Sequence, residues 1–470
     1  MTIGISAMGA YVPRTRLVRG AIADAHAWAI PQLRGLAKGQ VAAANWDEDS
    51  VTMAHAATRR LPLTDVTALT FCSTTMPFAD RSQASLLAEA LQLGSAVQTM
   101  DVGATARAGT SALLRALQQR VAGSVIAAAD KRLAKPGNPL ELQYGDAAVA
   151  MRIEEDAGLA EFVAGSSFTT DFVDHYRRSD ADFDYGFEDR WVRDTGFLQD
   201  LPGAINSLLA SVDSDPGDVA HLILNAPARV RAALAKSAGL KNARTEWDYD
   251  RCVGQAGTAE SLLGLSEALG TAAAGDLIMC IGFGQGADLL LFRALDNTDT
   301  FQRAVAGGQE DDNYLRFLSH RGLLKMDWGK RAERDVRTAQ SAYYRERDQI
   351  SGFVGGRCTV CGTLQFPRTQ ACVNPECRAF GTQEPVSFAD LTGRVKSFTE
   401  DWQAYSPAPP LMYGNIEFDG GANILMQFTD TASGELAVGA SVGMHFRIKD
   451  IDRTRQFQRY FWKATPHRGD

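Results

Sequence analysis

Four cysteines gathered in one short stretch constrain the fold of this chain more than any other feature. Cys358 and Cys361 form one pair, and Cys372 and Cys377 form a second pair shortly after it. Each pair lies beside turn-forming residues, and two such pairs supply the four thiolate ligands that zinc binds in a tetrahedral site. Since four ligands complete the coordination and leave no open position, the sequence predicts a structural zinc site.

The rest of the composition describes the setting of this site. Three further cysteines, Cys72, Cys252 and Cys280, are scattered, so the odd total of seven predicts metal ligands and free thiols rather than disulfides. A net charge of −8 argues against nucleic acid as a partner. No apolar run reaches membrane-spanning length, and the first residues lack the pattern of a signal peptide. We therefore expect a cytoplasmic protein with neither nucleic acid nor a membrane as partner.

The first 306 residues predict one layered α/β domain. Strand-like and helix-like runs alternate along this part, which is the order expected of such a fold. The strand-like runs are 66–74, 124–130, 147–153, 221–226 and 277–284, and the helix-like runs include 109–123 and 257–272.

The remainder of the chain predicts three smaller parts. Residues 307–350 are highly charged with helical spacing, which indicates an exposed helical connector or an arm that contacts another part. The cysteines define a zinc-binding segment, 351–384. Regularly spaced short strand-like runs follow in 385–470 and favour a small antiparallel barrel. Those runs are 394–402, 413–419, 423–430, 435–450 and 457–466.

The cysteine-containing segment also carries a family resemblance. GRCTVCGTLQFPRTQACVNPEC, followed by a β-rich tail, resembles the zinc-ribbon plus OB-fold family associated with acyl-CoA thiolases. The resemblance covers roughly 310–466. It implies a zinc ribbon at 351–384 and an OB-fold at 385–470, in a module that accompanies thiolase-like enzymes as a subunit or a fused domain.

The first 295 residues resemble the thiolase superfamily, and most of all 3-hydroxy-3-methylglutaryl-CoA synthase. This resemblance implies a layered α/β/α/β/α domain of two similar five-stranded halves, an acyl-CoA substrate and a homodimer. The segments that carry it are DEDSVTMAHAA (47–57), RAGTSALLRAL (107–117), GNPLELQYGDAAVAM (137–151) and IGFGQGA (281–287).

The family's nucleophile is missing from this chain. Members form an acyl-enzyme on a cysteine at the start of a buried helix, with a histidine nearby. The resemblance places Ala106 at the cysteine, Asn225 at the histidine and Gln255 at an asparagine, and Thr75 or a neighbour at an acidic residue. No cysteine lies between positions 72 and 252, so a small shift of the alignment restores no nucleophile.

Other polar residues are candidates for the chemistry that remains. Asn225 and Gln255 could stabilise an oxyanion, or could be ordinary buried amides. Tyr144 could act as an acid or base if its pKa were lowered, or could pack in the core. The His175–Tyr176 pair is a second acid–base candidate, or a surface feature. Lys38 and Arg107 could bind coenzyme A, or could be merely solvated.

Three functions are compatible with these residues. The first is a CoA-thioester carbon–carbon lyase or aldolase, because retro-aldol cleavage of a β-hydroxyacyl-CoA needs an acid and a base but no acyl-enzyme. The second is a non-catalytic subunit that binds acyl-CoA for a separate thiolase. The third is a condensing acyltransferase like 3-hydroxy-3-methylglutaryl-CoA synthase, with another nucleophile.

Overall fold

The computed structural model describes residues 2–328, 339–452 and 454–467, which form two compact units. Unit 1 contains Met1–Ala44, Asp49–Ser85 and Gly94–Phe317, and unit 2 contains the remainder, chiefly Leu318–Asp470. Of the expected connector at 307–350, positions 329–338 lie outside the described residues.

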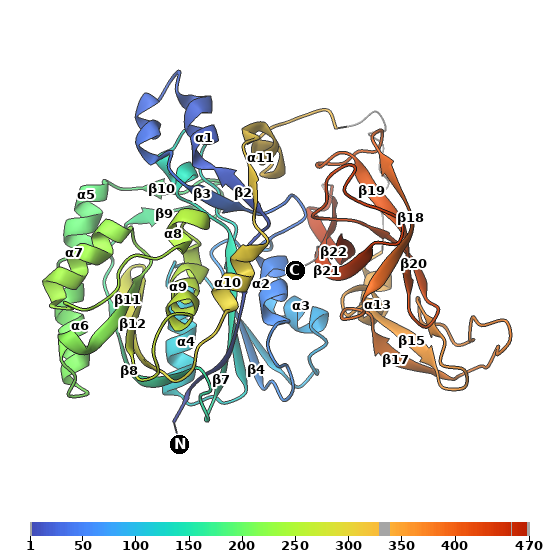
Figure 1. Ribbon diagram of the computed structural model, residues 1–470, viewed down its shortest axis with the longest axis horizontal. Coiled ribbons are helices and arrows are strands. Elements are labelled where there is room, and N and C mark those ends of the chain that lie inside the picture. Colours follow the sequence, from blue (N-terminus) through green and yellow to red (C-terminus); the bar gives the residue numbers. More distant parts are fainter. Residues whose placement is uncertain (1, 329–338, 453, 468–470) are drawn as a thin grey trace. The chain divides into compact units, whose positions relative to one another are not determined.

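A nine-stranded sheet organises unit 1 (Figure 1). Strands β1, β4, β5, β6 and β7 come from the first half of the unit, and β8, β11, β12 and β13 from the second. Their order is β11-β12-β13-β8-β1-β7-β6-β4-β5. Their bounds are Gly4–Tyr11 (β1), Ala68–Cys72 (β4), Gln98–Val102 (β5), Ser124–Asp130 (β6), Ala147–Glu154 (β7), Ala160–Thr169 (β8), Val219–Leu224 (β11), Leu277–Phe283 (β12) and Gly286–Ala294 (β13).

The pairing of these strands shows that the two halves repeat one topology. In the first half β1 pairs antiparallel with β7, β7 antiparallel with β6, and β6 parallel with β4. In the second half β8, β13, β12 and β11 follow with the same directions. The sequence pattern did not reveal this duplication, whereas the family resemblance did.

The halves differ at their outer edges. β5 pairs parallel with β4, but in the described second half only a single parallel bridge, between His221 and Arg244, occupies the corresponding place beside β11. The expectation of five strands in each half therefore holds for the first half, while the described residues of the second half form four. After Arg244 the chain turns inward instead, and Trp247 and Tyr249 are buried.

Two central helices lie between the halves of the sheet. Helix α4 (Ala108–Gln118) contacts β4 and β6 of one half and β12 and β13 of the other, and α9 (Glu260–Leu269) contacts β7, β11 and β12. Every residue of α9 is buried, as expected of a helix enclosed on all sides. A Cβ at Gly109 would lie 2.4 Å from the carbonyl oxygen of Thr258, so glycine allows the close approach of this segment to α4.

Outer helices complete the layers of unit 1. Helix α2 covers the first half of the sheet, and α6 and α7 cover the second. Two small sheets flank this core: β14, β2 and β3 form one, and β9 and β10 form the other. The bounds are Ser50–Thr58 (α2), Leu201–Ala210 (α6), Ala228–Ala238 (α7), Thr15–Val18 (β2), Gln40–Ala43 (β3), His175–Tyr176 (β9), Tyr185–Gly186 (β10) and Gln309–Asp311 (β14), with further helices at Arg19–His26 (α1), Asp189–Trp191 (α5), Tyr249–Cys252 (α8) and Thr300–Ala306 (α10). Helices α3 (Gln83–Ala90) and α11 (Tyr314–His320) each include residues of both units.

Unit 2 is rich in strands. Three of them, in the order β16-β15-β17, carry the cysteine segment, and five form a second sheet in the order β20-β19-β18-β21-β22. A parallel bridge between Phe428, just after β20, and Ala464 of β22 joins the two ends of that sheet. The bounds are Gln340–Arg345 (α12), Arg347–Ile350 (α13), Val354–Cys358 (β15), Leu364–Gln365 (β16), Gln383–Ser387 (β17), Gly393–Asp401 (β18), Leu411–Phe418 (β19), Asn423–Gln427 (β20), Ser441–Asp452 (β21) and Phe457–Pro466 (β22).

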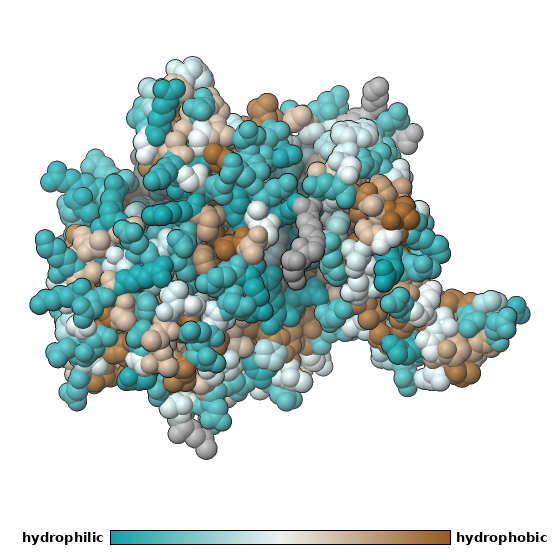
Figure 2. All heavy atoms as spheres, in the orientation of Figure 1, coloured by the Kyte–Doolittle hydropathy of each residue, from teal (hydrophilic) through white to brown (hydrophobic). Residues whose placement is uncertain are grey.

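The surface is predominantly hydrophilic on the face seen in Figure 2, where hydrophobic side chains form small separate groups. Among the described residues, no helix combines the length and the apolar character needed to cross a membrane.

Candidate functional site

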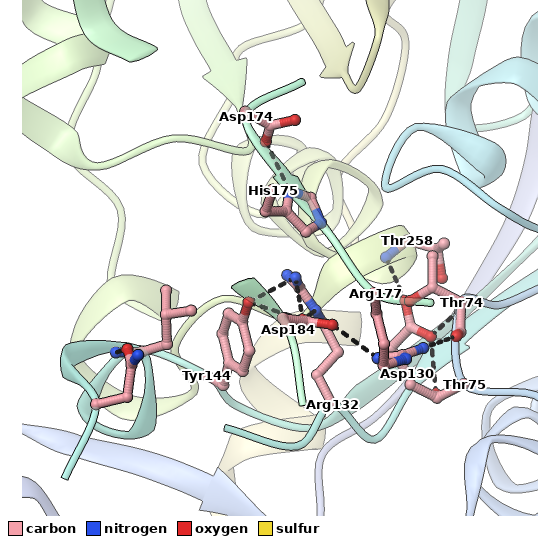
Figure 3. Close-up of polar contacts among 12 residues, drawn as sticks. Thr74, Thr75, Asp130, Arg132, Tyr144, Asp174, His175, Arg177, Asp184 and Thr258 are labelled. Atoms are coloured by element: carbon pink, nitrogen blue, oxygen red, sulfur yellow. Dashed lines mark hydrogen bonds and ion pairs between the residues drawn. The ribbon is translucent and has the colours of Figure 1, made fainter. Parts of the chain in front are cut away.

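Asp130 organises a polar cluster at the end of β6. Its side chain is fully buried, and its Oδ1 accepts hydrogen bonds from the Ser73 hydroxyl (2.9 Å), the Thr74 amide (2.7 Å) and the Thr75 hydroxyl (2.9 Å). Its Oδ2 accepts the backbone amide of Thr258, at 2.8 Å (Figure 3). The carboxylate thus joins the loop after β4 to the segment that leads into α9.

Gly257 makes room for this carboxylate. Its φ is +57°, and a Cβ there would lie 2.3 Å from Asp130 Oδ2, far inside van der Waals contact. Both the backbone conformation and the space favour glycine at this position. Asp130 and Gly257 therefore fix the start of α9 together.

A second carboxylate, Asp184, gathers two arginines and a tyrosine. Its Oδ2 accepts hydrogen bonds from Arg132 (2.6 Å) and from the Tyr144 hydroxyl (2.8 Å), and its Oδ1 accepts one from Arg177 (2.8 Å). Arg177 also donates to the Thr74 carbonyl oxygen, which connects the two clusters of Figure 3. Burial alone would raise the pKa of Asp184, but Arg132 and the hydroxyl of Tyr144 outweigh it and hold that pKa below its usual value.

Tyr144 is locked into this network. Its hydroxyl contacts Arg132 at 2.6 Å, and the Arg132 guanidinium lies 4.0 Å from the centre of the tyrosine ring. Burial raises the pKa of Tyr144 above its ordinary value, despite the nearby arginine. The lowered pKa on which an acid–base role of Tyr144 depended is thus absent.

Asp174 and His175 form a hydrogen-bonded pair on and beside β9. The Nδ1 atom of His175 lies 2.7 Å from Asp174 Oδ2, and Gln285 donates to Asp174 Oδ1 at 3.3 Å. Tyr176, the other member of the expected pair, points elsewhere: the residue is 47% exposed, and its ring packs against that of Tyr185. The structure therefore separates His175 from Tyr176 and pairs it with Asp174.

Ala106 lies just before α4 in the turn that starts this helix. Next to it the Thr105 hydroxyl donates to the carbonyl oxygen of Gly284, at 3.0 Å. A Cβ on Gly284 would come 3.3 Å from the Ala106 amide nitrogen, so the glycine-rich segment after β12 contacts the helix start. The methyl group of Ala106 supplies no nucleophile in this place.

Arg107 and Lys38, the expected coenzyme A contacts, lie in different settings. Arg107 forms an ion pair of 3.1 Å with the buried Asp288 and also donates to Ser167. Lys38 is exposed, and its carbonyl oxygen accepts a hydrogen bond from Arg19. No contact within the described residues brings Lys38 and Arg107 together.

Asn225 and Gln255 use their amides within the protein. Asn225 both donates to the carbonyl oxygen of Phe283 (2.9 Å) and accepts from its amide (2.7 Å). Gln255 donates through its side chain to Gln143 at 3.3 Å and pairs with it through the backbone as well. These amides join chain segments at the end of β11 and beside α9. Only the hydrogen-bonding capacity that these contacts leave unused could stabilise an oxyanion.

The other thiols of unit 1 are not poised for nucleophilic attack. Burial raises the pKa of Cys72 well above its ordinary value, and it raises the pKa of Cys280 to about 12. Burial also raises the pKa of Cys252 to about 11. Because the thiolate is the reactive form, none of the three is an activated nucleophile.

The four clustered cysteines of unit 2 converge on one point. Their sulfur atoms all lie within 4.8 Å of one another. The separation is 3.9 Å between Cys358 and Cys377, and 3.5 Å between Cys361 and Cys372. Four sulfurs bound at ~2.3 Å to one tetrahedral ion would be roughly 3.8 Å apart, so the cluster matches the size of such a site.

Comparisons with known proteins find similar sequences over about two thirds of this chain. The chain is 27% identical to the hydroxymethylglutaryl-CoA synthase of Aeropyrum pernix over 326 residues, which cover 67% of this chain and 90% of that protein. It is also 27% identical to the corresponding protein of Caldivirga maquilingensis over 352 residues, which cover 70% of this chain and all of that protein. No protein-family model matches the chain.

Solved structures agree with these relatives. PksG, a 3-hydroxy-3-methylglutaryl-CoA synthase from Bacillus subtilis, has a TM-score of 0.59 at 16% identity and covers 71% of this chain and 95% of its own. MvaS in complex with 3-hydroxy-3-methylglutaryl coenzyme A has a TM-score of 0.57 at 19% identity, with coverage of 67% and 91%. Unit 1 has the thiolase fold. It is similar to the fold of these hydroxymethylglutaryl-CoA synthases, as the resemblance implied.

Sequence reasoning missed several polar residues of this thiolase-fold unit. Asp130 ends a predicted strand, and a carboxylate at the end of a buried strand could have drawn attention to it. Asp174 directly precedes His175 in the sequence, but the expected pair joined that histidine to Tyr176 instead. Arg177 and Asp184 had no local signal, because each also contacts a distant segment: Arg177 donates to the carbonyl oxygen of Thr74, and Asp184 accepts from Arg132.

Proposed function

We propose that the thiolase-fold unit binds an acyl-CoA thioester and makes or breaks a carbon–carbon bond beside its carbonyl without forming an acyl-enzyme. The observation that carries this proposal is Ala106 at the start of α4, where the family resemblance places a cysteine. The raised pKa values of the other unit 1 thiols agree with it. The names of the relatives and of two structural neighbours, one with CoA and one with 3-hydroxy-3-methylglutaryl-CoA, support the thioester substrate.

The relatives favour the condensing direction over cleavage. Hydroxymethylglutaryl-CoA synthases are condensing enzymes by name, so we place aldol-type addition of a thioester enolate to a second carbonyl group first. The lyase reaction on a β-hydroxyacyl-CoA is the reverse of this addition and needs the same groups: one to move a proton and one to stabilise the negative charge on oxygen. We keep cleavage as the second direction of one reaction.

A non-catalytic role has one specific observation in its favour. At the position of the family's histidine, Asn225 uses both the nitrogen and the oxygen of its side-chain amide in hydrogen bonds to the backbone of Phe283. If the chain has this role, it binds acyl-CoA for a separate thiolase that has its cysteine.

Assays of the purified chain on acyl-CoA and β-hydroxyacyl-CoA substrates distinguish the enzymatic role from the non-catalytic role. Turnover by the chain alone excludes a purely non-catalytic role. Turnover only after a thiolase is added contradicts the enzymatic role.

A cysteine introduced at position 106 tests where the thioester binds. Intact-mass spectrometry of the wild type with acetyl-CoA should show no adduct, whereas Ala106→Cys should gain one acetyl group per chain, mapped to residue 106. The introduced thiol would sit at a helix N-terminus, where its thiolate is favoured. Ala112→Cys, which lies inside α4 rather than just before it, is the matched control and should stay unmodified. An adduct on Cys72, Cys252 or Cys280 in the wild type would refute the proposal.

For unit 2 we propose a structural zinc ribbon followed by an OB-fold. The sulfur distances and the complete set of four cysteines support zinc, held by Cys358, Cys361, Cys372 and Cys377. When bound, such an ion supplies folding energy rather than catalysis. The closed order β18-β19-β20-β22-β21 is that of a five-stranded OB barrel and supports the second assignment.

The organisation proposed for the whole chain follows from these assignments. Residues 1–306 form the thiolase-like domain, 307–350 the connector, 351–384 the zinc ribbon and 385–470 the OB-fold. A homodimer is part of the proposal because the resemblance implies it. Analytical ultracentrifugation of the full chain tests the dimer, and a sedimentation coefficient of the monomer over the micromolar range would contradict it.

A further inference from the structure

We propose that His175, oriented by Asp174, is the group that removes the α-proton of the acyl-CoA thioester. This inference rests on the proposed function and names the proton carrier of that site. It also assigns a role to Gln285, which holds Asp174 in place and connects it to the start of α4.

The hydrogen bond between the two side chains fixes the chemistry of the ring. The Asp174 carboxylate can only accept, so the Nδ1 of His175 carries a proton and donates it across 2.7 Å. The Nε2 atom is then left with its lone pair, and the described residues give it no hydrogen-bond partner. In Figure 3 the ring extends from Asp174 toward the side on which Arg177 and Asp130 lie. This is the tautomer and orientation that a general base requires.

The backbone around the pair is well defined. His175 pairs with Gly186 in the short sheet of β9 and β10, and the amide of Phe187 donates to the carbonyl oxygen of Asp174 at 3.0 Å. Two residues later Arg177 reaches both Asp184 and the Thr74 carbonyl oxygen. His175 is thus held between fixed points, with about a quarter of its side chain (23%) exposed for a substrate.

A short series of contacts leads from the pair to Ala106. Gln285 donates to Asp174, and its own carbonyl oxygen accepts a hydrogen bond from Arg107, which follows Ala106 directly. The preceding residue, Gly284, contacts Thr105 and the amide of Ala106. The pair therefore belongs to the same region as the start of α4, where the thioester carbonyl is proposed to lie.

The other candidates lack what this role needs. The amides of Asn225 and Gln255 cannot gain and lose a proton near neutral pH. Tyr144 can, but its hydroxyl is enclosed by Arg132 and Asp184 and its pKa is raised. The imidazole of His175 can gain and lose a proton, and part of its side chain is exposed. It could therefore supply the proton transfer that Asn225, at the position of the family's histidine, cannot.

The proposed step balances as follows. The Nε2 lone pair takes a proton from the carbon next to the thioester carbonyl, and the electrons of that C–H bond form the enolate. The imidazolium, stabilised by Asp174, either returns a proton to the same carbon or gives it to the alkoxide that forms when the enolate adds to a second carbonyl group. In D2O the imidazolium exchanges its proton with solvent, so it returns a deuteron to the carbon.

Deuterium exchange into acetyl-CoA tests this step without knowledge of the second substrate. The full-length wild type is incubated with acetyl-CoA in D2O, and mass spectrometry follows deuterium in the acetyl group, while calorimetry measures binding. His175→Gln should lower the exchange rate by about 10²-fold or more, which is the usual effect of losing a general base, and should leave binding unchanged. His26→Gln is the matched control, since His26 also contacts a carboxylate, that of Glu141, but lies elsewhere in unit 1.

A second variant tests the positioning role of Asp174. Asp174→Asn should lower the maximal exchange rate and leave unchanged the acetyl-CoA concentration that gives half of it, because the asparagine no longer fixes the ring. If the wild type does not bind acetyl-CoA, the proposed function fails. If the wild type binds it and exchanges, but His175→Gln exchanges equally fast, only the role of His175 is refuted. Binding without any exchange in the wild type also refutes that role.

Discussion

Replacing Gly257 by alanine should destabilise unit 1 by considerably more than the backbone conformation alone explains. The φ of +57° at this position already costs an alanine roughly 1–2 kcal/mol. The added Cβ would also lie 2.3 Å from Asp130 Oδ2 and 3.1 Å from Arg132 Cδ, where no small adjustment removes the overlap.

The magnitude follows from what the carboxylate must give up. To clear the new methyl group, Asp130 Oδ2 has to leave the amide of Thr258, which it contacts at 2.8 Å in a fully buried place. A buried donor left without its partner costs about 1–3 kcal/mol. Together with the backbone cost, we expect a loss of roughly 2–5 kcal/mol in the free energy of unfolding.

Gly239→Ala is the matched control for the backbone contribution. Gly239 ends α7 at a φ of +78°, and a Cβ there would meet nothing closer than Pro216, at 3.6 Å. This variant should lose only the roughly 1–2 kcal/mol of the left-handed conformation. The difference between the two variants therefore isolates the contact with Asp130.

Two measurements check the prediction. Urea unfolding followed by circular dichroism gives the loss for each variant relative to the wild type. Hydrogen exchange with mass spectrometry on peptides that contain Thr258 reports the local contact, and its amide should exchange faster in Gly257→Ala but not in Gly239→Ala. Equal losses in the two variants, with Thr258 still protected, would refute the view that Asp130 fixes the start of α9.

Two further predictions concern the cysteine cluster and a buried acid. Cys361→Ser should abolish zinc binding and expose the ribbon to proteolysis, whereas Cys252→Ser should retain about one zinc per chain. Elemental analysis measures the zinc content of both variants. A wild-type zinc content in Cys361→Ser would contradict the proposed site. Burial raises the pKa of Glu260 to about 8, and Asp250 adds to the shift. The folded state therefore holds the proton of Glu260 more tightly than the unfolded state, where the pKa is ~4.3. The resulting stabilisation is present below that unfolded pKa and is lost as the pH rises toward 8. Glu260→Gln cannot ionise and should therefore gain stability relative to the wild type between pH 5 and pH 8 in urea unfolding; a constant difference would show that Glu260 does not titrate there.

Local sequence patterns sufficed for much of the fold. The run 124–130 predicted β6 with its observed bounds, and 147–153 and 277–284 predicted β7 and β12 to within a residue. These strands are buried on both faces, and their continuous apolar runs are visible in the sequence without any knowledge of neighbours. The five strands of the second sheet of unit 2 were predicted as well, with β21 (Ser441–Asp452) starting later than expected.

Pairing between distant segments was invisible to such patterns. The duplication of unit 1 lies in the order and direction of strands, and the reduction of the last edge to one bridge at Arg244 depends on where the chain turns after α7. Neither leaves a period in the sequence. The roles of Asn225 and Tyr144 were equally undecided, because their partners Phe283 and Asp184 are far along the chain.

The sequence by itself therefore determined the strands, the cysteine cluster and, through resemblance, the alanine at position 106. These depend on residue type and on spacing within about twenty positions. Tertiary structure alone decided that Asp130 joins Ser73, Thr74, Thr75 and Thr258, and that His175 pairs with Asp174 while Tyr176 turns away. The physical reason is that a hydrogen bond depends on distance in space and a pKa on burial, and both are set by the packing of segments that the chain order keeps apart.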